Sequence, residues 1–244
     1  MNQLMTTPLA DIVNNQFQAA SVFEKYNLDY CCKGKRTLQQ ACLEQKVPVD
    51  KVVDELQNIT QPTCNLLDFN NIKLSLLAEY IVYAHHAYVK KEMPQIISLL
   101  QKVASKHGNK HPELYKISKL FFALSIEMNE HMNKEEIILF PRIKHIEKLA
   151  FEPIPLDNTM NDYIQSPIIN LEHEHEEAGN KMNEIRLLTN NYTPPSDACT
   201  TFKLMYACLH AFEIDLHHHV HLENSILFPK ALLLEKEVIM TTHN

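Results

Sequence analysis

Two segments of the chain have nearly the same sequence: His131-Met-Asn-Lys-Glu-Glu-Ile-Ile-Leu-Phe-Pro141 and His219-Val-His-Leu-Glu-Asn-Ser-Ile-Leu-Phe-Pro229. Both fit the pattern H-x3-E-x2-I-L-F-P, and they lie 88 positions apart (219 − 131). A histidine and a glutamate four residues apart project from the same face of a helix, one turn above the other. One such helix offers a metal both a nitrogen and a carboxylate oxygen. The repeat therefore predicts a duplicated helix pair that closes around a metal site, one that holds two metals.

The composition favours an almost wholly helical protein. Among 244 residues there are only three glycines and no tryptophan, whereas a β-rich fold would need more glycine at turn positions with positive φ. A net charge of −7 without a basic tract argues against a nucleic-acid partner. No apolar run approaches the ~20 residues of a membrane helix, and the first residues lack the features of an export signal. We therefore expect a cytoplasmic protein with no membrane partner.

The six cysteines are expected to be reduced thiols, because the chain is not small and no export is indicated. Cys31 and Cys32 are adjacent, and a disulfide between neighbours would be strained. Basic residues flank the pair and would depress the thiol pKa values. We therefore predict a reactive or metal-handling role for the pair, against the alternative of an ordinary surface loop. Cys199 and Cys208 have apolar neighbours on a predicted helix and are expected to be packing residues.

The first predicted unit, residues 1–62, is a small helical domain that contains the loop with the adjacent cysteines. Residues 37–40 (Thr-Leu-Gln-Gln) have the form of a helix capping box. The expected linker is Gln61-Pro62-Thr63. Such a unit is small for an independent core. We expect it to dock either on the larger domain or on a partner chain, which leaves room for a homodimer.

The second predicted unit, residues 70–236, consists of four long amphipathic helices with short connections. Their predicted spans are residues 70–106, 112–149, 162–189 and 195–236. This pattern predicts an up-down-up-down bundle. The expected fold class is therefore all-α, a four-helix bundle preceded by a small helical domain. Three prolines inside the spans predict a kink or break near each: Pro94, Pro141 and Pro229.

Each long helix carries a histidine that should face the bundle axis. On the second and fourth helices, apolar residues at spacings of three and four lead into the two His-x3-Glu pairs. A buried glutamate on such a stripe is costly unless a metal compensates it. On the third helix His175 lies on the apolar stripe, whereas His173 should face solvent. The first helix offers His85 or His86, and the apolar stripe and the 89-residue offset to His175 favour His86, with His85 as the alternative.

The predicted ligand set contains four histidines and two glutamates: His86, His131, Glu135, His175, His219 and Glu223. Six ligands exceed the four of a structural zinc site. Imidazole accepts several transition metals, and carboxylates can bridge two of them. Two bridging glutamates with two histidines on each metal would suit two irons joined by an oxo or hydroxo bridge. The order His-x3-Glu also differs from the Glu-x-x-His of ferritin-like di-iron bundles.

These motifs together resemble a known family. The bundle with two His-x3-Glu pairs is similar to a hemerythrin-like domain, over residues 70–235. The segment Asp-Tyr-Cys-Cys-Lys-Gly-Lys-x-Thr-Leu at residues 29–38 resembles the ScdA-type N-terminal domain. With Glu-His-Glu-Glu-Ala-Gly at 174–179 and Thr-Pro-Pro-x-x-Ala-Cys-Thr-Thr at 193–201, the chain resembles the RIC family, named for the repair of iron centres.

The resemblance implies a cytoplasmic di-iron protein that repairs iron–sulfur clusters damaged by nitrosative or oxidative stress. It would donate iron, bind or reduce nitric oxide, or do both, and whether such reduction is enzymatic stays open. The same six residues would hold the iron with both glutamates bridging, and Cys31 and Cys32 would take part in activity or iron transfer. Damaged iron–sulfur proteins are the implied partners, with nitric oxide or oxygen as the small ligand. The alternative is a hemerythrin-type protein that stores or senses oxygen or nitric oxide.

Overall fold

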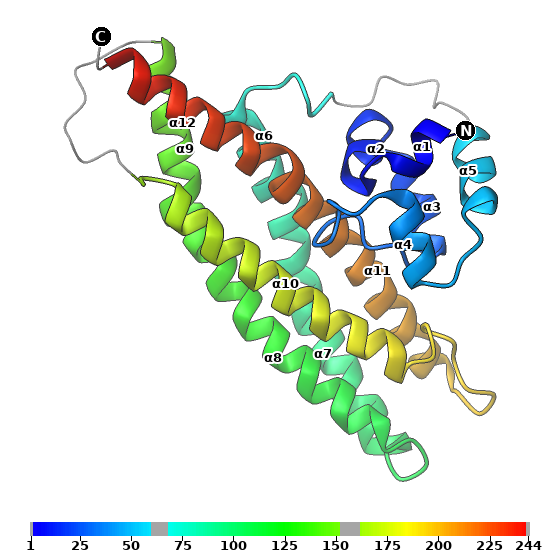
Figure 1. The fold of residues 1–244 in the computed structure, drawn as a ribbon. Helices are drawn as coiled ribbons and strands as arrows, with labels where there is room; N and C mark the ends of the chain where they lie inside the picture. The colour runs from blue at the N-terminus through cyan, green and yellow to red at the C-terminus, as the bar shows by residue number, and fades with distance from the viewer. Residues whose placement is uncertain (1, 60–67, 152–161, 243–244) are drawn as a thin grey trace.

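The computed structural model describes residues 2–59, 68–151 and 162–242, which form helices and connecting turns without a strand (Figure 1). The expected linker and most of the connection before residue 162 lie outside these ranges. The all-α prediction is confirmed. No helix in the described part of the chain has the length and apolar character needed to cross a membrane.

Four long helices lie side by side and form the bundle (Figure 1). The first consists of α6 (Leu74–Ile81), η1 (Val82–His86) and α7 (Ala87–His107). The second consists of α8 (Glu113–Lys134), η2 (Glu135–Leu139) and α9 (Phe140–Phe151). The third is α10 (Gln165–Leu188), and the fourth consists of α11 (Thr200–Leu222), η4 (Glu223–Leu227) and α12 (Phe228–Thr242). These helices form the predicted up-down-up-down bundle.

Three of these long helices contain one wide, π-helical turn (η1, η2 and η4), in which an N–H group bonds to the carbonyl five residues before it. The donors are Ala87, Phe140 and Phe228. Each turn begins or ends at a predicted metal ligand, as π-turns often do at functional sites. Pro141 and Pro229 directly follow two of the donors. At these prolines, where a kink or break is predicted, the helix therefore contains a wide turn and does not break. The helix also continues through Pro94, within α7.

The apolar core of the bundle has two parts. One part lies among α7, α8, α10 and α11 and includes Val89, Leu124, Met182 and Phe212. The other lies among α6, α9, the start of α10 and α12 and includes Leu77, Ile143, Ile168 and Phe228. The predicted ligands lie between the two parts, in a layer that is referred to below as the polar layer. The stripes that lead into them are buried as predicted.

The N-terminal region folds into five short helices that pack beside α11 and α12 (Figure 1). They are α1 (Asn2–Thr6), α2 (Leu9–Asn15), α3 (Ala19–Lys25), α4 (Leu38–Glu44) and α5 (Val49–Gln57). The predicted capping box at the start of α4 is present, with Thr37 and Gln40 each bonding to the other's main chain.

This N-terminal region is docked on the bundle of its own chain. Glu24 of α3 bonds to Nδ1 of His217 at 2.7 Å, and Arg186 of α10 donates to Oδ1 of Asn27 at 3.0 Å. These contacts fix the loop between α3 and α4, which carries the adjacent cysteines, against the middle of the bundle.

Candidate metal centre

The structure brings all six predicted ligands together in the polar layer, each at most 2% exposed. They form two overlapping groups in which the candidate ligand atoms lie within 4.8 Å of one another. His86 and His219 belong to the first group, and His131 and His175 to the second. Glu135 and Glu223 belong to both groups, so each carboxylate is positioned to bridge two metals.

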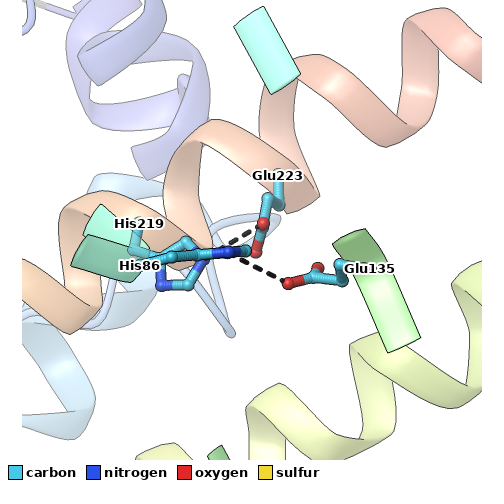
Figure 2. A group of neighbouring side chains, drawn as sticks. All are labelled: His86, Glu135, His219 and Glu223. Atoms are coloured by element: carbon cyan, nitrogen blue, oxygen red, sulfur yellow. Dashed lines mark hydrogen bonds and ion pairs between the residues drawn. The ribbon is translucent and has the colours of Figure 1, made fainter. Parts of the chain in front are cut away.

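Figure 2 shows the first group, in which His86 comes from the first long helix, Glu135 from the second, and both His219 and Glu223 from the fourth. Nε2 of His86 lies 3.3 Å from Oε2 of Glu135, and Nε2 of His219 lies 3.1 Å from Oε1 of Glu223. The two Nε2 atoms are 3.2 Å apart.

The second group has the same arrangement. Nε2 of His131 lies 3.4 Å from Oε2 of Glu135, and Nε2 of His175 lies 3.2 Å from Oε2 of Glu223. The two Nε2 atoms are 2.9 Å apart. Each glutamate therefore lies between one histidine of the first group and one of the second.

Several carboxylate oxygens of the two glutamates make no hydrogen bond within the described part of the chain. Both carboxylate oxygens of Glu135, and Oε2 of Glu223, are buried without a hydrogen-bond partner among the described residues. Oε2 of each glutamate is in ion-pair contact with imidazole at 3.2–3.4 Å but makes no hydrogen bond to any residue that the structure describes. Burying a polar group without a hydrogen bond costs about 2–7 kcal/mol, and burying a charge costs more. A cation in each group would satisfy them, and the combination of imidazole and carboxylate donors suits iron. The residues present therefore fit a pair of iron ions.

The electrostatics of the layer point the same way. Burial alone would raise the pKa of Glu223, but His219 and His175 outweigh it and hold that pKa well below the usual range. Burial would lower the pKa of His131, but the charge of Glu135 and the hydrogen bonds of the ring raise it to about 10. Without metal, protons on imidazole thus balance the buried carboxylates. Metal binding takes over this role and must release protons.

Three of the four histidines have a partner for the second ring nitrogen, Nδ1. The pairs are His86 with Glu136 at 2.8 Å, His131 with Glu174 at 2.9 Å, and His175 with Asn224 at 2.8 Å. Such partners fix the orientation of a ligand ring and raise its basicity. The bond from His131, followed by that from Lys134, lowers the pKa of Glu174 to about 2, against the effect of burial.

The sequence reasoning did not identify these three partners. Glu136 and Asn224 directly follow the two glutamates of the repeat, and Glu174 directly precedes His175. That adjacency is the available signal, because a residue next to an inward-facing ligand projects about 100° around the helix from it and so lies at the side of the bundle core.

His85 lies outside both groups of ligands, whereas His86 lies inside the first. Nδ1 of His85 is 3.0 Å from Oδ1 of Asp215. Its ring is stacked on that of His219, with centroids 5.6 Å apart and an angle of 6° between the planes. His173 is exposed, as expected.

The adjacent cysteines lie against the outside of the candidate centre. Sγ of Cys32 is 3.5 Å from the main-chain oxygen of His175, and the two sulfurs are 3.9 Å apart. One carboxylate oxygen of Asp29 accepts hydrogen bonds from three successive N–H groups, those of residues 31–33. Asp29, Cys31 and Cys32 form a third group able to hold a metal ion. The two cysteines also line a cavity of about 540 Å³ that reaches Asn224, the partner of His175.

Two predictions about the cysteines are wrong. The hydrogen bond with Cys32, burial and the charge of Asp29 raise the pKa of Cys31 well above its usual value, so the flanking cations do not depress it. One of those cations, Arg36, is paired with Glu44. Cys199 is exposed at the N-terminus of α11 rather than packed, and the main-chain N–H of Phe202 lowers its pKa. Cys208 packs against the core, as expected.

Further histidines on α11 hold the N-terminal region rather than the centre. His217 pairs with Glu24, and His218 lies against Phe17, with ring centroids 5.1 Å apart. His221 is fully buried, 5.4 Å from the ring of Tyr30. Sequence periodicity places these residues beside the ligands but cannot show that another domain covers them.

Two family models match the chain. Residues 78–231 match the hemerythrin HHE cation binding domain, and residues 5–60 match ScdA_N, described as a domain of unknown function. The fold and the site thus define a hemerythrin-like metal-binding bundle with an ScdA-type N-terminal domain.

Whole-chain comparison narrows this class. The iron-sulfur cluster repair proteins YtfE of Enterobacter sp. (strain 638) and of Escherichia coli O81 (strain ED1a) are each 35% identical over 225 residues, covering 92% of this chain and 96% of theirs. YtfE of Escherichia fergusonii is 34% identical over the same shares. The chain therefore belongs to the YtfE family of iron–sulfur cluster repair proteins, as its motifs predict.

Proposed function

We propose that this chain is a di-iron protein that repairs damaged iron–sulfur clusters by donating iron from the polar layer. The observation that carries the proposal is the pair of buried ligand groups that share both glutamates. Two irons held there would supply redox-active, exchangeable metal. His86 and His219 would hold one iron and His131 and His175 the other, while Glu135 and Glu223 belong to both ligand groups.

Cys31 and Cys32 are proposed as the residues that receive iron as it leaves the centre. They lie on the cavity that reaches Asn224, and Cys32 touches the main chain of His175. Asp29 adds a carboxylate to the two thiols. Because the Cys31 thiol has a raised pKa, it stays protonated until a metal displaces the proton. That property suits brief binding rather than storage.

The remaining assignments are proposals of the same kind. The matched ranges 5–60 and 78–231 support the division into an N-terminal domain, residues 1–62, and a bundle, residues 70–236. The partners are damaged iron–sulfur proteins, with nitric oxide or oxygen as a small ligand at the irons. A cytoplasmic location agrees with this chemistry. Because the N-terminal domain is docked on the bundle of its own chain, a homodimer would pair two chains that are each folded in this way.

The test uses the full chain loaded with isotopically labelled iron and an iron–sulfur enzyme inactivated by nitric oxide. The wild type is expected to restore enzyme activity and to pass label into the cluster. His131→Leu and Glu223→Leu should lose iron and restoration together, while the exposed His173→Leu serves as the matched control. Replacing both cysteines by serine should leave iron binding intact and slow the transfer.

Restoration by the iron-free variants would overturn the proposal. Reversible oxygen binding through repeated cycles, with all iron retained and no label transferred, would instead favour the storage function.

A further inference from the structure

The two halves of the bundle repeat their ligands. They also repeat most of the hydrogen bonds made by the second ring nitrogen, Nδ1, of the ligand histidines. His131 and Glu135 correspond to His219 and Glu223, and His86 corresponds to His175. Glu136 directly follows Glu135 and is hydrogen-bonded to Nδ1 of His86. Asn224 directly follows Glu223 and is hydrogen-bonded to Nδ1 of His175. The two partners therefore occupy equivalent positions, although Glu136 offers a carboxylate oxygen and Asn224 a neutral amide oxygen.

The repeat is broken at one position. Glu174 directly precedes His175 and is bonded to Nδ1 of His131 at 2.9 Å. The corresponding residue, directly before His86, is His85, which should face Nδ1 of His219. It presents a stacked ring instead, and its own Nδ1 bonds to Asp215.

His219 is left without the partner that the other three histidines have. Its Nδ1 is fully buried and has no hydrogen-bond partner among the described residues. A ligand histidine without such a partner is less firmly oriented and less basic, and loss of a partner of this kind typically lowers metal affinity by about 10–100-fold. The two ligand groups therefore have the same ligand types but, within the described ranges, only in the second group do both histidines have a hydrogen-bond partner at Nδ1.

We propose that the iron held by His86 and His219 is the labile one of the pair, and that His85 is the positioning residue that makes it so. This inference rests on the proposed di-iron function and names the iron that is donated first. The iron held by His131 and His175 is released more slowly, since both of these histidines have a hydrogen-bond partner at Nδ1. The centre would thus release its metal in two steps.

The test follows the removal of iron from the full chain, loaded anaerobically with two ferrous ions, by an excess of a ferrous chelator. The wild type is expected to lose one iron per chain in each of two phases, with rates about 10-fold or more apart. His85→Gln offers an amide oxygen to His219 and an amide N–H to Asp215, so it should slow the fast phase. His85→Ala, which offers no acceptor, should not slow it.

A reciprocal variant tests the other half of the molecule. Glu174→His copies the His85 arrangement and should speed the slow phase toward the fast one. The exposed neighbour His173→Gln is the matched control and should leave both rates unchanged. Glu136→Gln, behind His86, should speed only the fast phase and so assigns that phase to the first ligand group.

Release of both irons in one phase would overturn the inference, as would a fast phase that His85→Gln leaves unchanged. This failure is distinct from failure of the proposed function. Two-phase release without cluster restoration would contradict the repair function alone, while restoration with single-phase release would contradict only the order of release.

Discussion

The sulfur of Cys32 lies 3.5 Å from the main-chain oxygen of His175, so the N-terminal domain touches a residue of the candidate centre without entering the ligand set. Gly179, one turn further along α10, leaves the space for this contact. A Cβ atom at that position would lie 3.3 Å from the same sulfur, which is tighter than an ordinary van der Waals contact. The absence of a side chain on α10 thus sets how closely the thiol approaches.

Gly179→Ala is expected to displace Cys32 by a few tenths of an ångström while strengthening α10. Alanine is favoured over glycine inside a helix by about 0.5–1 kcal/mol. We expect faster alkylation of Cys32, measured by mass spectrometry, with an unchanged or slightly higher free energy of unfolding. Asn180→Ala, at the next position, is the control. An unchanged rate of Cys32 alkylation would contradict the close contact.

Iron binding at neutral pH is expected to release at least one proton per chain. In the metal-free chain the pKa of His131 is raised to about 10, so at pH 7 the ring carries a proton that a metal must displace. Affinity for iron should therefore fall as the pH is lowered from 10. Titration of the metal-free protein with ferrous iron in weakly buffered solution measures the release. Binding without proton release at pH 7 would show that His131 is not a ligand.

Glu24→Ala is expected to loosen the N-terminal domain from the bundle. The substitution leaves His217 partly buried without its partner at 2.7 Å, a loss of about 1–3 kcal/mol. Hydrogen exchange should increase in α3 and in the cysteine loop. Lys25→Ala is the matched control, because it removes an exposed ion pair with Glu55 in the same domain and exposed pairs contribute little. Equal effects of the two variants would argue against docking through Glu24.

Glu235→Gln is expected to stabilise the metal-free protein at pH 7 and to leave it unchanged near pH 4. Burial raises the pKa of Glu235 above its usual 4.5, so the folded protein binds this proton more tightly than the unfolded chain. The contribution of this proton binding to the free energy of unfolding is then complete below pH 4.5, and it is lost as the pH rises through the pKa of Glu235 in the folded protein. Glutamine cannot ionise and still accepts the N–H of Ile164, which bonds to the carboxylate at 3.0 Å.

Denaturant unfolding of both proteins at pH 7 and at pH 4 measures this difference. A glutamine variant that is less stable than the wild type at pH 7 would show that the charged form is favoured at this site.

The long helices and the positions of the six inward residues could be predicted because helical periodicity fixes which face each residue occupies. Periodicity also separates His175 from His173, two residues away on the same helix. It does not show which residue of a neighbouring helix lies opposite. Glu136, Glu174 and Asn224 were missed for that reason, since each supports a histidine of a different helix.

The chemistry of the cysteines was harder to predict, because local charge does not show which groups are already paired. Arg36 follows the cysteines in the sequence but is bound to Glu44, while Asp29 and Cys32 contact the Cys31 sulfur. Similarly, the exposure of Cys199 depends on where α11 begins. The docking of the N-terminal domain on His217 and His218 depends on contacts between residues nearly two hundred positions apart.

The polar layer also divides the bundle mechanically, because the apolar clusters on its two sides do not merge. Each cluster is a candidate cooperative unit of unfolding, connected to the other by helix backbone and by the charged side chains between them. Two irons held by the six ligands would join all four long helices at the point where apolar packing is interrupted. Loss of these irons would remove the link between the two clusters, so the metal-free chain is expected to unfold less cooperatively than the metal-loaded one.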